Sequence, residues 1–172
     1  MFHHLAHFKV ILLPVLFAGM LAIIASCTDN GVTPVVLNDI GPFDTTGVPH
    51  YKAENGFTIY FHEQGYGNTD ISENDVIRLR YTGRTLDGDI FDSSKRDGVD
   101  SPISLNVGGL VPGFKYGLAG VVIDGNRKHA ARIGSIRTLV IPPEYGYSGT
   151  SNSLNEDTLI FDIEILGFSQ EN

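Results

Sequence analysis

Tyr81 and Asp92 are the pair of side chains whose types and spacing first suggest chemistry. Both lie in the segment YTGRTLDGDIFDSS, residues 81–94, where two short stretches flank a turn signal. If the two stretches are paired strands, the phenol can donate a hydrogen bond to the carboxylate across them. One interpretation is a functional site. The other is structural, with Tyr81 as a core aromatic and Asp92 capping the turn at the following serines.

The dipeptide Asp87-Gly88 predicts how the two stretches are joined. It favours a two-residue hairpin turn in which both residues have positive φ. Gly83 then opposes Asp92, and its missing side chain leaves room for the contact with the phenol. In this register Phe91 points to the opposite face, unless a β-bulge near the strand end turns it back.

The segments that must position this pair have the two-residue alternation of half-buried strands. They are FTIYFHE, DVIRLRYTGRTL, SIRTLVI and TLIFDIEIL. In the second segment Ile77, Leu79 and Tyr81 share one face, and the arginines between them point the other way. The apolar face of the last segment consists of Leu159, Phe161, Ile163 and Ile165.

The segment PGFKYGL is the one candidate helix, because proline is favoured at a first helical position and Pro112 opens the segment. Short strands combined with a single helix predict the α+β class. We therefore expect an antiparallel sheet covered on one side by a short helix.

Residues 1–26 are predicted to be a signal peptide. A weakly basic start with Lys9 precedes the uncharged run VILLPVLFAGMLAIIAS, which ends in small residues. The sequence IASC resembles a bacterial lipobox, which would make Cys27 the lipid-attachment residue and the mature N-terminus. Cys27 is the single cysteine, so no internal disulfide competes for it. A noncleaved membrane anchor and a free thiol are the alternatives.

Residues 27–55 are predicted to be a flexible tether, because they mix Gly, Pro, Thr, Asn and Asp without a sustained period. A single folded domain is expected from Gly56 to residue 172. Without residues 1–26 the chain has 11 Lys and Arg against 20 Asp and Glu. This negative charge disfavours binding to nucleic acid.

Four segments, taken in order, resemble the FKBP family of peptidyl-prolyl cis-trans isomerases from about Ser72 to Phe168. They are YTGRTLDGDIFDSS, SPISLNVGGLVPGFKYGL, RIGSIRTLVIPPEYGYSG and DTLIFDIEIL. The resemblance implies a curved antiparallel sheet wrapped around one short α-helix, with a shallow apolar bowl on its concave face. It also implies a monomer that needs no cofactor or metal, proline-containing peptide segments as substrates, and macrolides such as tacrolimus and rapamycin as inhibitors.

The resemblance assigns the site residue by residue. The positions that it implies to be catalytic are Tyr81, Phe91, Asp92, Val111, Tyr147 and Phe161. The positions that it implies to bind substrate are Ile103, Leu110 and Phe114. Two of these have implied partners: the Val111 N–H donates to a substrate carbonyl, and the Tyr147 hydroxyl reaches substrate backbone.

The chemistry implied for these residues is modest. Rotation about an X-Pro bond must overcome amide resonance, a barrier of roughly 18–20 kcal/mol, but no covalent bond is made or cleaved. The twisted transition state loses charge separation, so an apolar, water-poor site favours it over the planar amide. Tyr81 and Asp92 are implied to orient the carbonyl that precedes the proline. Acid–base catalysis by Asp92 is the weaker proposal, because no net proton is transferred.

Three features depart from the family pattern. The segment AGVVIDGNRKHA, residues 119–130, is an insertion that forms either a small hairpin at Asp124-Gly125 or a plain loop. The segment SNSLNEDTL lacks the usual Ile-Pro-Pro, so Leu154 or Ser153 stands at that wall. Smaller residues also line the bowl, since Phe114 replaces a tryptophan and Ile103 replaces a residue that is often aromatic.

Other chemistries fit the sequence less well. His50, His62 and His129 lack partners at metal-ligand spacing, and neither a nucleophile elbow nor a phosphate loop is present. Our hypothesis is a lipid-anchored isomerase of the bacterial cell envelope, facing the periplasm or the cell surface, that assists the folding of exported proteins. The alternative is a noncatalytic chaperone or peptide-binding module of the same fold.

Overall fold

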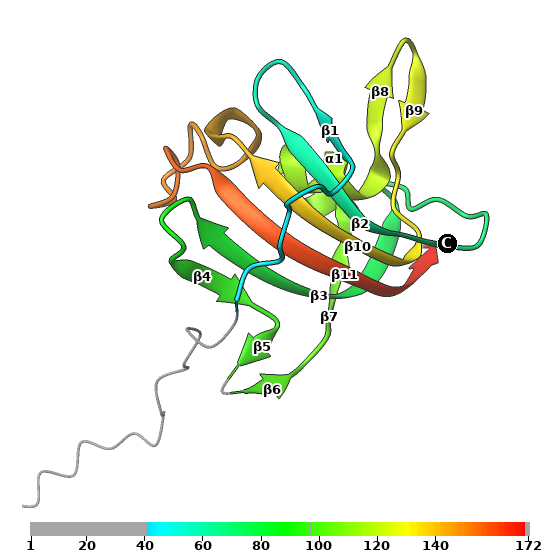
Figure 1. Cartoon of the computed structure of the whole chain (residues 1–172), viewed down its shortest axis with the longest axis horizontal. Coiled ribbons are helices and arrows are strands. Elements are labelled where there is room, and N and C mark those ends of the chain that lie inside the picture. Colours follow the sequence, from blue (N-terminus) through cyan, green and yellow to red (C-terminus); the bar gives the residue numbers. More distant parts are fainter. Residues whose placement is uncertain (1–40, 97, 171–172) are drawn as a thin grey trace, which may run out of the picture. The chain divides into compact units, whose positions relative to one another are not determined.

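The computed structural model describes residues 41–96 and 98–170. Within them, seven strands form an antiparallel sheet in the order β1-β2-β10-β11-β3-β4, with β7 also paired to β3 (Figure 1). Two small hairpins, β5-β6 and β8-β9, lie outside this sheet. The strands are β1 (His50–Lys52), β2 (Thr58–Tyr66), β3 (Asp75–Thr85), β4 (Ile90–Ser93), β5 (Lys95–Arg96), β6 (Val99–Asp100), β7 (Ile103–Asn106), β8 (Val121–Ile123), β9 (Asn126–Lys128), β10 (Ile133–Ile141) and β11 (Leu159–Gln170).

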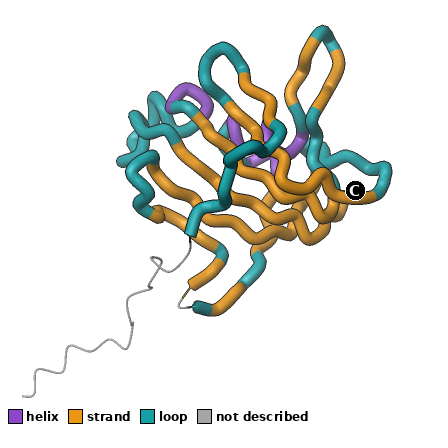
Figure 2. Tube along the Cα trace, in the orientation of Figure 1, coloured by secondary structure: helices purple, strands orange, loops and turns teal. Residues whose placement is uncertain are grey.

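Among the described residues there is one α-helix, α1 (Pro112–Ala119), besides two single-turn 3-10 helices, η1 (Val107–Gly109) and η2 (Pro143–Tyr145). Figure 2 shows how little of this part of the chain is helical. The predicted α+β class, an antiparallel sheet with one short helix, is confirmed.

The core lies between the sheet and α1, and the predicted strand faces are confirmed. Ile77 and Leu79 of β3 are fully buried. The apolar residues on the same face of β11, the strand paired with β3, are also buried. The buried apolar side chains of the three central strands are Ile77, Leu79, Leu139, Ile141, Leu159, Phe161, Ile163 and Ile165. Alternation along each strand therefore places one continuous apolar face under the helix.

The helix begins at Pro112, as predicted, and lies close to β10. Two glycines permit this approach. A Cβ at Gly117 would lie 2.3 Å from Leu139 Cδ1, and one at Gly113 would lie 2.4 Å from Ile141 Cγ2. Helix propensity alone would favour alanine at these positions, so the glycines indicate that close packing decides the sequence here.

The turn between β3 and β4 differs from the prediction. The Gly88 N–H donates to Thr85 O at 3.1 Å, and the Thr85 N–H donates to Asp89 O at 3.0 Å. Gly88 has a φ of 91°, but Asp87 does not have a positive φ. The prediction of a two-residue Asp87-Gly88 turn was therefore wrong. The chain instead makes a four-residue turn over residues 85–88, and its last residue, Gly88, has the one positive φ.

The hairpin β8-β9 was one of two interpretations of the insertion, and the structure contains it. Asp124 and Gly125 have φ values of 51° and 73°, as a two-residue turn of this kind requires. The buried Arg137 of β10 holds the base of the hairpin. Its guanidinium donates to Gly117 O, His129 O and Ala130 O at 2.7, 2.6 and 2.8 Å, and burial lowers the pKa of Arg137 to about 10.

The folded part of the chain starts before Gly56, where we expected it to begin. Strand β1 (His50–Lys52) pairs with β2 at the edge of the sheet. Upstream of it, the Phe43 N–H donates to Asp162 Oδ2 at 3.2 Å. Part of the predicted tether is therefore bound to the sheet.

The signal peptide and Cys27 lie outside the described residues. Over residues 41–96 and 98–170, no helix has the length and hydropathy needed to cross a membrane.

Candidate active site

Four aromatic rings meet on the face of the sheet that carries α1, and we call them the aromatic cluster: Tyr81, Phe91, Phe114 and Phe161. Phe161 lies at the centre, with its ring centroid 4.8 Å from Phe114, 5.5 Å from Phe91 and 6.3 Å from Tyr81. The Phe114 and Phe91 rings both contact Phe161 edge to face, an arrangement that aromatic pairs favour. The cluster brings together β3, β4, α1 and β11.

Phe91 reaches the cluster through a β-bulge. Gly83 pairs with Asp92, but the next residue of β3, Arg84, pairs with Ile90, so Phe91 has no partner in the register. The extra residue turns the Phe91 side chain toward Phe161. From the sequence, Phe91 could share a face with the Tyr81 phenol only through a β-bulge, and the structure contains this bulge.

The predicted hydrogen bond between Tyr81 and Asp92 is present at the edge of the cluster. The phenol donates to Asp92 Oδ2 at 2.5 Å, and the Ser93 N–H donates to Asp92 Oδ1 at 2.9 Å. Burial, and then the hydrogen bond to the carboxylate, raise the pKa of the Tyr81 phenol, which therefore keeps its proton at neutral pH. Arg96 adds a positive charge 3.9 Å from Asp92 Oδ1.

Three other predicted residues flank the cluster. Leu110 and Val111 lie directly before the helix, are half-buried and pack against the core. Tyr147 follows η2 and is likewise half-buried against the core, and it contributes to the raised pKa of Tyr81 as a minor cause. Ile103 lies on β7 opposite Leu79 of β3.

Of the two candidates for the wall before the last strand, Leu154 is the one that packs inward. It is half-buried against the core, whereas Ser153 is exposed. An apolar side chain therefore stands there.

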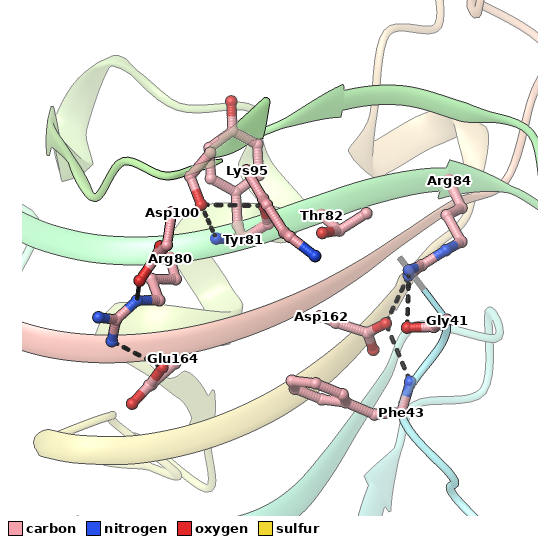
Figure 3. A pocket seen from close by; sticks show the side chains of 11 residues that line it. Gly41, Phe43, Arg80, Tyr81, Thr82, Arg84, Lys95, Asp100, Asp162 and Glu164 are labelled. Atoms are coloured by element: carbon pink, nitrogen blue, oxygen red, sulfur yellow. Dashed lines mark hydrogen bonds and ion pairs between the residues drawn. The ribbon is translucent and has the colours of Figure 1, made fainter. Parts of the chain in front are cut away.

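The opposite face of the sheet has a hollow of about 230 Å³ that the sequence did not predict (Figure 3). Arg84 and Asp162, both almost fully buried, form an ion pair at one end, with Arg84 Nη1 2.5 Å from Asp162 Oδ2. Arg80 binds Asp100 and Glu164 at the other end. The available signal was the charged residues that share this face, Arg80 and Arg84 in β3 and Asp162 and Glu164 in β11.

Contacts to residues 41–43 cover the buried ion pair. Arg84 Nη2 donates to Gly41 O at 3.0 Å, and Thr138 Oγ1 donates to Asp162 Oδ1 at 2.6 Å. The Phe43 ring lies edge-on against His62, with centroids 5.4 Å apart. Because these contacts pair the buried charges within the protein, neither charge is left exposed as a reactive group.

The aromatic cluster is an apolar centre beside one fixed polar pair. Phe114 and Phe161 are buried, whereas Tyr81 and Phe91 at its margin remain partly exposed. Within the residues that the structure describes, no group of His, Cys, Asp and Glu could hold a metal ion. The chemistry available is desolvation and orientation, which suits a reaction that needs no nucleophile.

Comparison with known proteins identifies the family. The family model described as FKBP-type peptidyl-prolyl cis-trans isomerase matches residues 67–166, which include all nine predicted site residues other than the lipid-attachment cysteine. FK506-binding protein 2 of Dictyostelium discoideum is 33% identical over 98 residues, which are 55% of this chain and 66% of that protein. The isomerase FkpA of Escherichia coli K12 is 33% identical over 116 residues, which are 66% of this chain and 38% of that protein.

Solved structures show the same fold. The crystal structure of FkpA from Escherichia coli aligns with a TM-score of 0.57 at 28% identity, covering 70% of this chain and 52% of that one. The crystal structure of AtFKBP13 aligns with a TM-score of 0.56 at 27% identity, covering 70% of this chain and 99% of that one. Of the two relatives named in the preceding paragraph, FK506-binding protein 2 and FkpA, the chain spans less than two thirds of the length.

Gly83 should be required for the packing of the aromatic cluster. A Cβ there would lie 2.7 Å from Phe91 Cζ and 2.8 Å from Phe161 Cε1. We expect Gly83→Ala to lower the free energy of unfolding in urea by about 1–3 kcal/mol, because the rings cannot both keep their positions. Gly109→Ala is the matched control, since its Cβ would meet nothing within 4 Å. Equal stability of the two variants would contradict this account of the cluster.

Proposed function

The chain belongs to the family of FKBP-type peptidyl-prolyl cis-trans isomerases, and we propose that it catalyses X-Pro isomerisation at the aromatic cluster. The observation that carries the proposal is the Tyr81–Asp92 hydrogen bond at the edge of four packed rings. An X-Pro segment of a substrate lies against Phe114 and Phe161, with the proline ring in apolar surroundings.

Desolvation is the main catalytic contribution. A planar amide is strongly polarised and loses part of that polarisation as it twists, so removing water raises the free energy of the ground state more than that of the transition state. Phe91, Phe114 and Phe161 supply the apolar surroundings, with Leu110 and Val111 at the margin. No proton has to be gained or lost in this step.

The polar groups then divide between acceptors and donors. The Tyr81 proton is donated to Asp92, so that pair offers oxygen lone pairs to the substrate. The donors assigned to substrate carbonyls are the Val111 N–H and the Tyr147 hydroxyl. Together they hold the backbone on one side of the X-Pro bond while the other side rotates.

Asp92→Ala should reduce the activity, because it removes the acceptor that fixes the Tyr81 phenol. We expect kcat/KM in a protease-free assay of cis-to-trans relaxation to fall by about tenfold or more. Asp89→Ala, an exposed carboxylate on the same hairpin, is the control and should behave as the parent. Rapamycin should abolish the parent's activity. A folded parent chain that gives no acceleration would contradict the enzyme and favour the noncatalytic binding module.

We further propose that the protein is a lipoprotein of the bacterial cell envelope that assists the folding of exported polypeptides. The uncharged run before IASC and the position of Cys27 support this location. A monomer held by lipid would present its site to chains that emerge from the export machinery on the periplasmic or the outer side.

Cys27→Ala should abolish lipid attachment. We expect the parent, expressed with residues 1–172 in a bacterial host, to fractionate with membranes and to start at a diacylated Cys27 by mass spectrometry. The variant should lose both properties while keeping isomerase activity, because the cysteine lies outside the predicted domain. Membrane association that survives the substitution would favour the noncleaved anchor.

A further inference from the structure

A cavity of about 300 Å³ is lined by none of the residues of the aromatic cluster, and we call it the tyrosine groove. Its main lining residues come from four separate segments of the chain: Tyr51, Phe57, Tyr116, Val121, Val122 and Tyr145. Three of the rings contact one another, with centroids 6.3 Å apart for Phe57 and Tyr116, 6.0 Å for Phe57 and Tyr145, and 5.6 Å for Tyr116 and Tyr145.

The groove and the aromatic cluster share helix α1, and the short segment after η2 runs from one to the other. Helix α1 presents Phe114 to the cluster and Tyr116, two residues later, to the groove, because side chains two apart lie on nearly opposite sides of a helix. Similarly, η2 ends in Tyr145 at the groove, and Tyr147 follows beside the cluster. The two sites are therefore neighbours across one short helix and one turn.

The lining indicates what the groove could bind. Among the described residues no charged side chain lines it. Three tyrosines and Phe57 contribute rings, and Asn55 contributes an amide. Aromatic grooves of this composition bind extended, proline-containing segments, which lose little entropy because their backbone is already extended. Val122 is 69% exposed and Tyr116 is 36% exposed, so apolar surface remains in contact with water while the groove is empty.

We propose that the tyrosine groove is a second binding site for the isomerase substrate, holding an extended, apolar and proline-containing part of the polypeptide that flanks the X-Pro bond in the aromatic cluster. This inference rests on the proposed isomerase function. An extended flank of about six residues reaches ~20 Å, enough to pass from one side of α1 to the other. The enzyme would then favour long unfolded chains over short peptides.

The hairpin β8-β9 gives the groove one of its walls, through Val121 and Val122. Arg137 donates to His129 O and Ala130 O directly after this hairpin and to Gly117 O of α1, which ties the base of the hairpin to the helix without a ligand. A fixed wall lowers the entropy that binding must overcome. The insertion in the family pattern thereby acquires a role in substrate selection.

The test compares one X-Pro core in two peptides, a tetrapeptide and a version lengthened to about 12 residues with proline and leucine in the flanks, a span of ~40 Å. Val122→Ser should leave kcat/KM for the tetrapeptide as in the parent. For the long peptide it should raise KM about fivefold, with kcat unchanged, because an apolar contact is lost. Leu86→Ser is the control, since Leu86 is 68% exposed on the β3-β4 turn and should change neither value.

Either of two results would overturn the proposal: a long-peptide KM that is the same in Val122→Ser and the parent, or an equal loss for both peptides. If the parent has no isomerase activity on either peptide, the proposed function fails and the groove is tested by binding alone. Fluorescence anisotropy of a labelled proline- and leucine-rich peptide should then show weaker binding to Val122→Ser than to Leu86→Ser. Equal affinity, or no binding to the parent, would refute the groove as a binding site.

Discussion

The contact of Phe161 with three other rings is the interaction on which the site depends. Strand β11 lies between β10 and β3, and Phe161 pairs with Leu139 on one side and with Gly83 on the other. Its ring contacts Phe114 of the helix and Phe91 of the bulged β3-β4 hairpin, and so joins these two segments. The site therefore forms only when sheet, hairpin and helix have all folded, and its positions are held by core packing rather than by a loop.

The other face of the same strand fixes its register. Asp162, next to Phe161, forms a buried ion pair with Arg84 and accepts a hydrogen bond from Thr138. A slip of one residue would exchange the faces, placing a carboxylate under the helix and an aromatic ring against Arg84. Both outcomes are costly, because a buried charge without its partner lowers the free energy of unfolding by several kcal/mol, on the order of 3–5. The buried pair thus fixes which face of β11 carries the aromatic cluster.

Much of this arrangement could be predicted from local patterns. Alternation revealed the faces of β3 and β11, Pro112 located the helix start, and the spacing of Tyr81 and Asp92 predicted their hydrogen bond. The features that local patterns did not predict depend on contacts with distant parts of the chain. Asp87-Gly88 fits more than one turn, and the turn found here occurs together with a bulge at Phe91, so that Gly83 still pairs with Asp92. Strand β1 is too short to show a period. The tyrosine groove draws on segments that no local pattern connects.

The central claim is that substrate binds on the helix side of the sheet, against Phe161. The most direct measurement is a titration of the isotope-labelled chain with an X-Pro peptide, followed by two-dimensional NMR. We predict concentration-dependent shifts for Tyr81, Asp92, Val111 and Phe161, together with faster exchange between the cis and trans signals of the peptide. Shifts confined to Arg80, Arg84 and Glu164 around the hollow on the opposite face, with unchanged exchange, would contradict the account.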